Sequence, residues 1–538
     1  MKLKTLQWTK RSMAVLLTSS IVLSACENEE TVQEPSNSAK PTATTGTTQT
    51  NQFKDKLTLN WFVPAPSNSS LPTDDTDFVR KRIEEKFNVD LKVTYMVAGN
   101  DYNSKINVLL ASTPPDMWRD NTPDGGQKYA IDGLLADLTR FVTPVTMPNY
   151  FKYWTSEEEV KRYRTNNQYV RAPLPRPKRT YRSWYVRKDW LDKLGLKMPN
   201  NYDEYVNMLK QFTFNDPDGN GKQDTYGFTT SGNGANLGYD WPEFVKNDLP
   251  FPSFIENNQY ADSSMHPKME QVLNDVVKLM NDKVIDPDWF LNKAPQHIEK
   301  AIQGKVGVVL SGAKNFAYDN NTQGIQYRTK QINSQAEWQP MPIFANKAIG
   351  SKSAPGSPIL FPKTVADKNP ERIERTTAIL DWLASEEGYL LTHYGVEGKH
   401  YTRDGNIIKL NVEAYTNDVT KKGDFLSIWN FFTSDVSQPE VYNMELIDGR
   451  ETDRDRNIAK VLNAIPLNDY IGAPLVAPLG FDLPAFRKRQ NELFAKAIFE
   501  DKSGKNWPQY REELLTKYKG KELFDAYNQN LRDAGVIK

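Results

Sequence analysis

The chain has 538 residues, a formal net charge of +0, four histidines and a single cysteine. Its 38% share of apolar residues excludes a protein with many membrane spans, and its length suggests roughly two to four domains. A balanced charge argues against a nucleic-acid-binding protein, which normally carries a basic excess. One cysteine excludes an internal disulfide framework and any cysteine-based zinc or iron–sulfur site.

The first 25 residues carry the pattern of an export signal. Four basic residues precede the apolar stretch Met13–Leu23, whose 11 residues are too few for a membrane span of about 20. Residues 23–26 read Leu-Ser-Ala-Cys and resemble a bacterial lipobox. The resemblance implies cleavage before Cys26 and a diacylglyceryl group on its sulfur. The alternative is an ordinary signal peptide followed by a chance cysteine.

Residues 26–54 are predicted to be the lipidated cysteine and a disordered tether. From Glu27 to Asn51 there is no aromatic residue, leucine or isoleucine, so this segment cannot bury enough apolar surface to fold. Because no later run approaches ~18 continuous apolar residues, no transmembrane helix is expected. We therefore expect a protein that is anchored to a membrane by lipid and does not span it.

Four elements are predicted in order after the tether. Residues 56–63 largely alternate and predict a strand, and residues 77–87 predict a helix that Asn88 ends. Residues 89–97 predict a second strand, and residues 103–111 predict a second helix. This order favours an α/β fold with a largely parallel sheet, in which ligands usually bind at the carboxyl ends of the strands.

Five segments, in one order, resemble the extracellular solute-binding proteins, family 1, of carbohydrate ABC importers. The last of them is most similar to the large Gram-positive lipoprotein branch of that family. The resemblance covers the chain from about residue 55 to the C-terminus. The matching segments are 109–118 (LLASTPPDMW), 132–138 (DGLLADL), 183–205 (beginning SWYVRKDWLDKLGL), 302–307 (IQGKVG) and 381–401 (with DWLASEEGY and YGVEGKHY).

The resemblance implies a periplasmic-binding-protein-like fold, in which two α/β lobes are joined by a hinge and enclose a ligand cleft. We place a first crossing between the lobes in residues 171–182, which hold three prolines and five basic residues, and a return crossing in residues 344–362. The expected divisions are an N-lobe first part (55–175), a C-lobe first part (176–345), a return mainly in the N-lobe (346–440) and an end mainly in the C-lobe (441–538).

A calcium loop is predicted after the helix expected at residues 202–212. Residues 216–224 read DPDGNGKQD and place oxygen donors at positions 1, 3, 5 and 9 of an EF-hand-like loop. Gly227 at position 12 departs from the usual bidentate glutamate, and a polar turn without a metal is the alternative. The resemblance agrees with a structural Ca²⁺. The predicted ligands are Asp216, Asp218, Asn220, Lys222 (through its carbonyl), Asp224 and Thr225.

Aromatic and polar residues in loops near strand ends are the predicted ligand contacts. Indole rings pack against the apolar faces of sugars, while polar groups bind the hydroxyls. Trp190, Trp382 and Trp507 are instead expected to be structural, and Arg119 and Arg187 are candidate partners for acidic sugars. Core packing is the alternative for each aromatic residue. The predicted contacts are Trp61, Trp118, Arg119, Asp120, Asn121, Trp184, Tyr239, Asp240, Trp241 and Trp429.

The predicted function is capture of an oligosaccharide by a monomeric receptor, anchored to the outer face of a cell membrane, for delivery to an ABC-type permease. A surface glycoside hydrolase is one alternative, because carboxylate pairs arise by chance among 68 acidic residues. A carbohydrate-binding adhesin is another. The sequence holds no G-x-S-x-G, H-E-x-x-H or P-loop motif, and the resemblance favours binding without catalysis.

Overall fold

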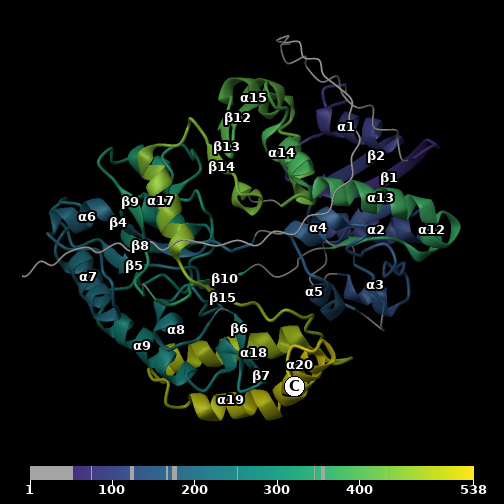
Figure 1. Cartoon of the computed structure of the whole chain (residues 1–538). Helices are drawn as coiled ribbons and strands as arrows, with labels where there is room; N and C mark the ends of the chain where they lie inside the picture. The colour runs from purple at the N-terminus through teal and green to yellow at the C-terminus, as the bar shows by residue number, and fades with distance from the viewer. Residues whose placement is uncertain are drawn as a thin grey trace, which may run out of the picture. The chain divides into compact units, whose positions relative to one another are not determined.

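The computed structural model describes residues 53–73, 75–121, 126–164, 168–171, 178–250, 252–344, 346–352, 358–434 and 437–538. The expected signal peptide, Cys26 and the expected tether up to residue 52 lie outside these ranges, as do parts of both expected crossings. Within the described ranges, no helix is both long and apolar enough to cross a membrane. Helices and strands mix along the chain, which confirms the predicted α/β class (Figure 1).

A four-stranded sheet lies at the centre of the first lobe. Strands β1, β2 and β3 run parallel, with Leu57 opposite Val89 and Trp61 opposite Met117. Strand β11 adds an antiparallel edge beside β3, which gives the order β11-β3-β1-β2. The largely parallel sheet predicted from the sequence is therefore present. The strands are β1 (Leu57–Ala65), β2 (Val89–Val97), β3 (Met117–Arg119) and β11 (Ile359–Leu360).

Helix α1 (Phe78–Phe87) follows the predicted boundaries because its ends are fixed locally. The Asp77 carboxylate accepts hydrogen bonds from the N–H groups of Val79 and Arg80 at 3.1 and 3.0 Å, which caps the N-terminus. Asn88 ends the helix in the left-handed region, with φ of 49°. Three apolar residues spaced four apart then form one buried face against the sheet.

Further elements of the first lobe come from two separate parts of the chain. A three-stranded sheet of order β12-β13-β14 lies in the second part. The elements are α2 (Asn100–Ala111), α3 (Gln127–Ile131), α4 (Pro148–Tyr153), α5 (Glu157–Arg162), α12 (Lys363–Lys368), α13 (Pro370–Leu383), α14 (Glu386–Tyr394), β12 (Tyr401–Asp404), β13 (Ile407–Leu410), α15 (Val412–Asp418), α16 (Leu426–Trp429), β14 (Glu445–Ile447) and 3₁₀ turns at Thr420–Lys422, Asn430–Phe432 and Pro439–Tyr442.

The second lobe is built on another four-stranded sheet, of order β5-β8-β4-β9. β4 runs antiparallel to both β8 and β9, and β5 runs parallel to β8. All five residues of β4 are buried, as expected of a strand covered on both faces. The strands are β4 (Ser183–Arg187), β5 (Tyr226–Phe228), β8 (Val306–Ser311) and β9 (Trp338–Met341).

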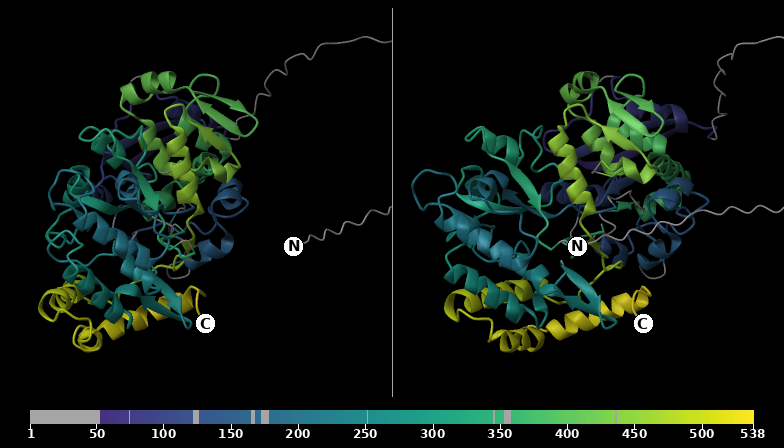
Figure 2. Two further views of the ribbon diagram at one scale, coloured as in Figure 1. Left: turned by 90° about the vertical axis from the view of Figure 1, so that its left-hand side faces the viewer. Right: turned by 60° about the vertical axis from the view of Figure 1, so that its left-hand side comes forward.

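Helices of the second lobe include a C-terminal group, α18 to α20, which packs beside α9 and β7 (Figure 1; Figure 2). This group carries the last part of the chain to the lower edge of Figure 1. The elements are α6 (Lys188–Lys193), α7 (Tyr202–Phe214), α8 (Pro242–Lys246), β6 (Ser253–Glu256), β7 (Gln259–Asp262), a 3₁₀ turn (Ser263–Met265), α9 (Met269–Asn281), α10 (Gln296–Ile302), α11 (Ile325–Lys330), α17 (Asp453–Ala464), α18 (Leu483–Ala495), a π-helical turn (Lys496–Glu500), α19 (Trp507–Thr516) and α20 (Gly520–Asp533).

The two lobes have separate hydrophobic cores, and each core combines distant parts of the chain. The main core of the first lobe takes its buried residues from 59–169 and 359–444. The core of the second lobe takes its buried residues from 181–349 and 458–527. Between β14 and α17 the chain therefore passes from one lobe to the other, in residues 448–452. The domain limits proposed from the sequence stay predictions.

Three segments of the chain, around Thr180, Ser351 and Asn468, lie together beside the expected crossings. Ser351 accepts hydrogen bonds at its carbonyl from the N–H and the hydroxyl of Thr180, at 2.9 and 2.8 Å. The short strands β10 (Gly350–Ser351) and β15 (Leu467–Asn468) pair in parallel next to this contact. Residues 172–177 and 353–357 of the two expected crossings lie outside the described residues. The described ends of the two expected crossings are therefore joined to each other by hydrogen bonds, at the place where rotation between the lobes is expected.

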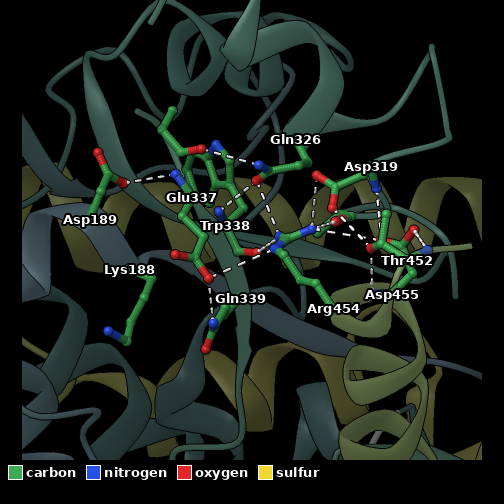
Figure 3. A network of polar contacts seen from close by, with 12 residues as sticks. Lys188, Asp189, Asp319, Gln326, Glu337, Trp338, Gln339, Thr452, Arg454 and Asp455 are labelled. Atoms are coloured by element: carbon green, nitrogen blue, oxygen red, sulfur yellow. Dashed lines mark hydrogen bonds and ion pairs between the residues drawn. The ribbon is translucent and has the colours of Figure 1, made fainter. Parts of the chain in front are cut away.

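Helix α17 is fixed to the second lobe by Arg454 (Figure 3). Its guanidinium donates to the carbonyl of Ala317 at 2.8 Å, to the side chain of Gln326 and to the carbonyl of Trp338. At the start of the same helix, Asp455 is fully buried and accepts the N–H of Asp319 at 2.8 Å. These contacts join α17 to β9 and to the loop before α11, so the helix moves with the second lobe.

Candidate functional site

A cavity of about 480 Å³ lies in the second lobe and is lined by aromatic rings and a few polar groups. We call it the Tyr239 pocket. Apolar walls with a small number of convergent polar groups are the usual make-up of a small-molecule site. Its lining residues are Asn236, Leu237, Gly238, Tyr239, Phe244, Pro252, Ser253, Tyr260, Asp262, Ser264, Leu475, Arg487, Gln490, Asn491, Phe494 and Tyr527.

One ion pair organises the polar side of the Tyr239 pocket. The Arg487 guanidinium donates to Asp262 at 2.5 Å and to the amide oxygen of Gln490 at 3.0 Å. Asp262 also accepts the N–H and the hydroxyl of Ser264, at 2.9 and 2.6 Å. Burial lowers the pKa of Arg487, but the charge of Asp262 and its hydrogen bond, together with the nearby tyrosines, raise it by a larger amount. The pKa of Arg487 is therefore higher than usual. The pocket therefore holds a fixed cation beside tyrosine rings.

The loop after β3 places three predicted contacts together in the first lobe. Arg119 is nearly buried, and its guanidinium carbon lies 4.4 Å from the ring centre of Phe431, a cation–π distance. Asp120 is buried, and its N–H donates to the carbonyl of Pro358. The half-buried Asn121 accepts the Asn103 side-chain amide at its carbonyl, at 3.4 Å. This edge is the carboxyl end of a parallel sheet, where ligands usually bind.

In the second lobe, Tyr239 and Asp240 lie in the loop before α8. The Asp240 carboxylate accepts the hydroxyl of Thr230 at 2.6 Å, and Arg182 donates to the carbonyl of Tyr239. Burial lowers the pKa of Arg182, and the charge of Asp240 opposes that shift. Burial likewise lowers the pKa of His297, again against Asp240. Asp240 thus lies near two basic groups at the end of β5.

The five predicted tryptophan contacts are core residues in this structure. Trp61, Trp118, Trp184, Trp241 and Trp429 are each at most 1% exposed. Trp184 donates its indole N–H to the carbonyl of Asp240 at 2.7 Å, and Trp429 donates to the Asp77 carboxylate. Their role as ligand contacts stays a prediction, and it would require these rings to become accessible.

Three further tryptophans and Arg187 are also buried in this structure. Trp190, Trp382 and Trp507 are buried, which confirms their structural role. The role of Arg187 as a partner for acidic sugars stays a prediction, and it would require this side chain to become accessible. It is 1% exposed and donates to the Asp189 carboxylate at 2.8 and 2.5 Å, because the two side chains lie two residues apart at the start of α6.

The predicted calcium loop folds as a turn held by its own carboxylates. Asp216 accepts the N–H groups of Gly219, Asn220 and Gly221 at 2.9 to 3.0 Å. The Asn220 amide nitrogen donates to Asp218 at 2.9 Å and to Asp224 at 3.1 Å. The backbone then enters β5, so no second EF-hand helix follows.

Nearby N–H groups and one ammonium group offset part of the negative charge of this loop in the structure. Lys305 donates to Asp224 at 2.6 Å and is the main cause of that residue's lowered pKa. Burial and a side-chain hydrogen bond with Asp216 raise the pKa of Asp218, and the charges of Asp224 and Asp216 add to that rise. Thr225 is 1% exposed and donates to the carbonyl of Phe212 at 2.7 Å. Among the described residues, no group of three or more His, Cys, Asp or Glu side chains is arranged to hold a metal ion.

Most of the Tyr239 pocket was not predicted from the sequence. Of its lining residues, only Tyr239 was a predicted contact. Asp262 and Arg487 lie 225 positions apart, and no local motif links them. The spacing of Arg487 and Gln490 on one face of α18 was the available signal, but such a pair is common on helices.

No family model matches the chain. Lipoprotein LipO of Bacillus subtilis (strain 168) is 25% identical over 370 residues, which span 65% of this chain and 69% of that protein. The polygalacturonan/rhamnogalacturonan-binding protein YtcQ of the same organism is 25% identical over 229 residues, 40% and 43% of the two chains. The fructooligosaccharide ABC transporter substrate-binding protein FusA of Streptococcus pneumoniae serotype 4 is 26% identical over 325 residues, 57% and 58%.

Solved structures share the fold over nearly the whole chain. An HMO binding, ABC-transporter associated solute binding protein from Bifidobacterium longum infantis gives a TM-score of 0.69 at 17% identity, covering 90% of this chain and 100% of that one. A FusA EF-hand mutant in complex with fructo-nystose gives 0.61 at 16%, covering 89% and 99%. The alginate-binding protein AlgQ2 without calcium ion gives 0.60 at 16%, covering 90% and 99%.

Proposed function

We propose that this chain, which has the fold of the solute-binding proteins of carbohydrate ABC importers, captures an oligosaccharide outside the cell and delivers it to an ABC-type permease. The observation that carries the proposal is the Tyr239 pocket, which combines tyrosine rings with a fixed Arg487–Asp262 pair. Rings of this kind pack against sugar C–H faces, and the polar pair supplies donors and acceptors to hydroxyls. The sugar-binding names of two relatives and of a structural neighbour support the same class of ligand.

Capture would use both lobes. The Tyr239 pocket belongs to the second lobe, while Arg119, Asp120 and Asn121 lie at the strand ends of the first. A sugar that contacts one lobe first and both lobes afterwards favours the arrangement with more contacts. The hydrogen-bonded segments at Thr180 and Ser351 would absorb the rotation. Transport energy would come from a separate ATPase.

The proposal also places the protein on the outer face of a membrane through a lipid on Cys26. The lipobox resemblance and the lipoprotein name of LipO support this position. One lipidated cysteine at the mature N-terminus, followed by the tether, would leave the two lobes free to meet a permease. A monomer suffices for this role, because both lobes come from one chain.

The first prediction concerns binding of sugars. One class of oligosaccharide, neutral or uronic, is expected to raise the melting temperature, with a stabilisation of about 2.7 kcal/mol at 100 times its Kd. Tyr239→Ala should raise the Kd for that sugar about tenfold by removing a stacking surface. Tyr327→Ala is the matched control, since this exposed tyrosine on α11 does not line the pocket. Thermal shift and calorimetric titration measure both effects.

Two results would contradict this proposal. Absence of stabilisation by any saccharide would argue against a sugar ligand. Release of shorter sugars from the stabilising oligosaccharide would favour the hydrolase alternative over a receptor.

We further propose that the loop 216–224 binds a structural Ca²⁺. Three carboxylates and the oxygens of Asn220 and Lys222 are the hard donors that this ion prefers. In the described structure, the Asn220 amide nitrogen bridges Asp218 and Asp224, and Lys305 pairs with Asp224. The neutral amide and the Lys305 ammonium group thus lie where a bound cation would relieve the repulsion among the carboxylates. Two structural neighbours, an EF-hand mutant of FusA and a form of AlgQ2 without calcium ion, support the proposal.

Calcium removal should therefore lower the stability of the protein. EDTA is expected to reduce the melting temperature of the wild-type chain, by the equivalent of about 2.7 kcal/mol if calcium was at 100 times its Kd. Asp218→Ala should abolish this response. Asp203→Ala is the control, because Asp203 is exposed on α7 outside the loop. A melting temperature that chelation leaves unchanged would contradict the calcium site.

A further inference from the structure

A second cavity, of about 790 Å³, lies where the two lobes meet beside the hinge. We call it the hinge pocket. The crossing residues Lys178 and Arg179 line it, together with first-lobe residues from 437–446 and second-lobe residues from 451–463. None of the predicted ligand contacts and none of the Tyr239 pocket residues belongs to it. The proposed sugar site therefore does not explain this cavity.

The two walls differ in charge, apart from the crossing cations Lys178 and Arg179, which donate to the first-lobe carbonyl of Trp154 and the second-lobe carbonyl of Leu462. The first-lobe wall, on the turn Pro439–Tyr442 and on β14, carries two exposed acidic residues, Glu440 and Glu445. The second-lobe wall carries the cations Lys314, Arg456 and Lys460, against one carboxylate, Glu451. Complementary potentials on facing surfaces attract the surfaces and set how they dock.

The acidic residues of the first-lobe wall and the basic residues of the second-lobe wall are not paired with each other in this structure. Within the described residues, Glu440, Glu445 and Lys460 make no ion pair. Arg456 reaches only the neighbouring Asp453 and the carbonyl of Glu451. Apolar groups of Val441, Met444 and Ala459 line the space between them. The cavity thus has the composition of an interface whose two sides are apart.

Each wall is tied to its own lobe by hydrogen bonds, and a short segment of chain joins the two walls. α17 is held to the second lobe through Arg454 and Asp455 (Figure 3). On the other side, Tyr442 is bound to the first lobe through its hydroxyl, which donates to the carbonyl of Ala384 at 2.7 Å. Only residues 448–452 separate β14 from α17. Rotation of the lobes about the crossings must therefore change the distance between the walls.

We propose that the hinge pocket is an electrostatic latch, in which rotation of the lobes brings Glu440 and Glu445 into ion pairs with Arg456 and Lys460 and so stabilises a second lobe arrangement. This inference rests on the lobes and their crossings and holds whatever the sugar is. Exposed ion pairs are individually weak, so each pair is expected to shift the ratio of the two arrangements about two- to fivefold. Because the pairs are exposed, salt should weaken the latch.

The test measures the distance between the lobes without any sugar. Spin labels are attached at Lys409→Cys on β13 and Asn457→Cys on α17, both exposed positions outside the pocket, in the full chain carrying Cys26→Ser. Pulsed electron paramagnetic resonance should then show two populations, with the short distance favoured at about 0.01 M salt and reduced at about 1 M. If no sugar stabilises the protein but the two distance populations still respond to salt, the latch is supported while the proposed function is not. The two proposals can therefore be refuted independently.

Charge reversal distinguishes a latch from a general salt effect. Lys460→Glu and Glu445→Lys should each lower the short-distance population about two- to fivefold, and the double variant should restore it. The control pair Glu413→Lys and Lys488→Glu changes two exposed charges, neither of which lines the hinge pocket, and should have no effect. Thermal unfolding verifies that each variant is folded. The proposal would be overturned if neither salt nor Lys460→Glu changed the distance distribution. It would also be overturned if the double variant had no larger short-distance population than the single variants.

Discussion

Replacing Arg487 by methionine is expected to lower the free energy of unfolding by about 3 kcal/mol in the absence of any sugar. Arg487 is the cation opposite Asp262, whose side chain is 3% exposed. Without it, the carboxylate stays buried with only the N–H and hydroxyl of Ser264 as its partners in the described structure. Leaving a buried carboxylate without its cation costs more than the pair itself contributes. Denaturant unfolding at neutral pH measures the loss.

A double variant separates the orphaned charge from the lost contacts. Asp262→Asn combined with Arg487→Met removes both charges, so it should lose less stability than Arg487→Met alone. Lys488→Met is the neighbouring control on α18, since Lys488 is exposed and should change stability by less than about 0.5 kcal/mol. A double variant that is less stable than Arg487→Met would show that the charge of Asp262 is not the cause. Sugar affinity should fall in both pocket variants.

Stability is expected to rise as the pH falls from 8 to 5 because of Glu243. This side chain is fully buried on α8, and burial raises its pKa from 4.5 to about 7. The Tyr202 hydroxyl, which donates to it at 2.8 Å, and Lys246 oppose that shift, whereas Asp275 adds to it. Below pH 4.5 the carboxyl is protonated in both states and contributes no pH dependence. Between pH 4.5 and 7 the Glu243 carboxyl loses its proton in the unfolded chain but keeps it in the folded one. The free energy of unfolding therefore falls as the pH rises through this range, by about 3 kcal/mol in total once the pH is above 7.

Glu243→Gln should remove most of this pH dependence and stabilise the protein at pH 8. The glutamine keeps a carbonyl oxygen that can accept the Tyr202 hydroxyl. Glu413→Gln, at an exposed position on α15, is the control and should leave the pH profile unchanged. Unfolding by denaturant at several pH values gives both curves. If the free energy of unfolding of Glu243→Gln depends on pH as strongly as that of the wild type, Glu243 is not the cause of the pH dependence.

Local signals were sufficient to predict much of the first lobe. The boundaries of α1 and β2 match because a cap, a left-handed asparagine and an alternating pattern mark them within a few residues. Helix α2 starts three residues earlier than expected, at Asn100, because Gly99 and not a side-chain cap precedes it. Short strands such as β3 and β11 have too few residues for a periodic signal, and they become strands through pairing with each other.

The candidate site was less predictable because it depends on contacts between distant residues. A tryptophan beside a strand end has the same local sequence whether its ring faces a ligand or the core. Trp429 is an example: its indole N–H turns inward to Asp77, which lies 352 positions earlier and already caps α1. The carboxylates of residues 216–224 were recognisable from spacing alone, but the pairing of Asp224 with Lys305, 81 positions away, was not.

The interleaving of the two cores has a consequence for how the chain acquires its structure. The first lobe needs residues up to 444 to complete its core, and the second needs residues up to 527. The first lobe therefore cannot complete its core before residue 444 is available, nor the second lobe before residue 527 is available. Contacts between parts so far apart in sequence also make folding slow. Both lobes therefore complete their cores late, only after most of the chain is available.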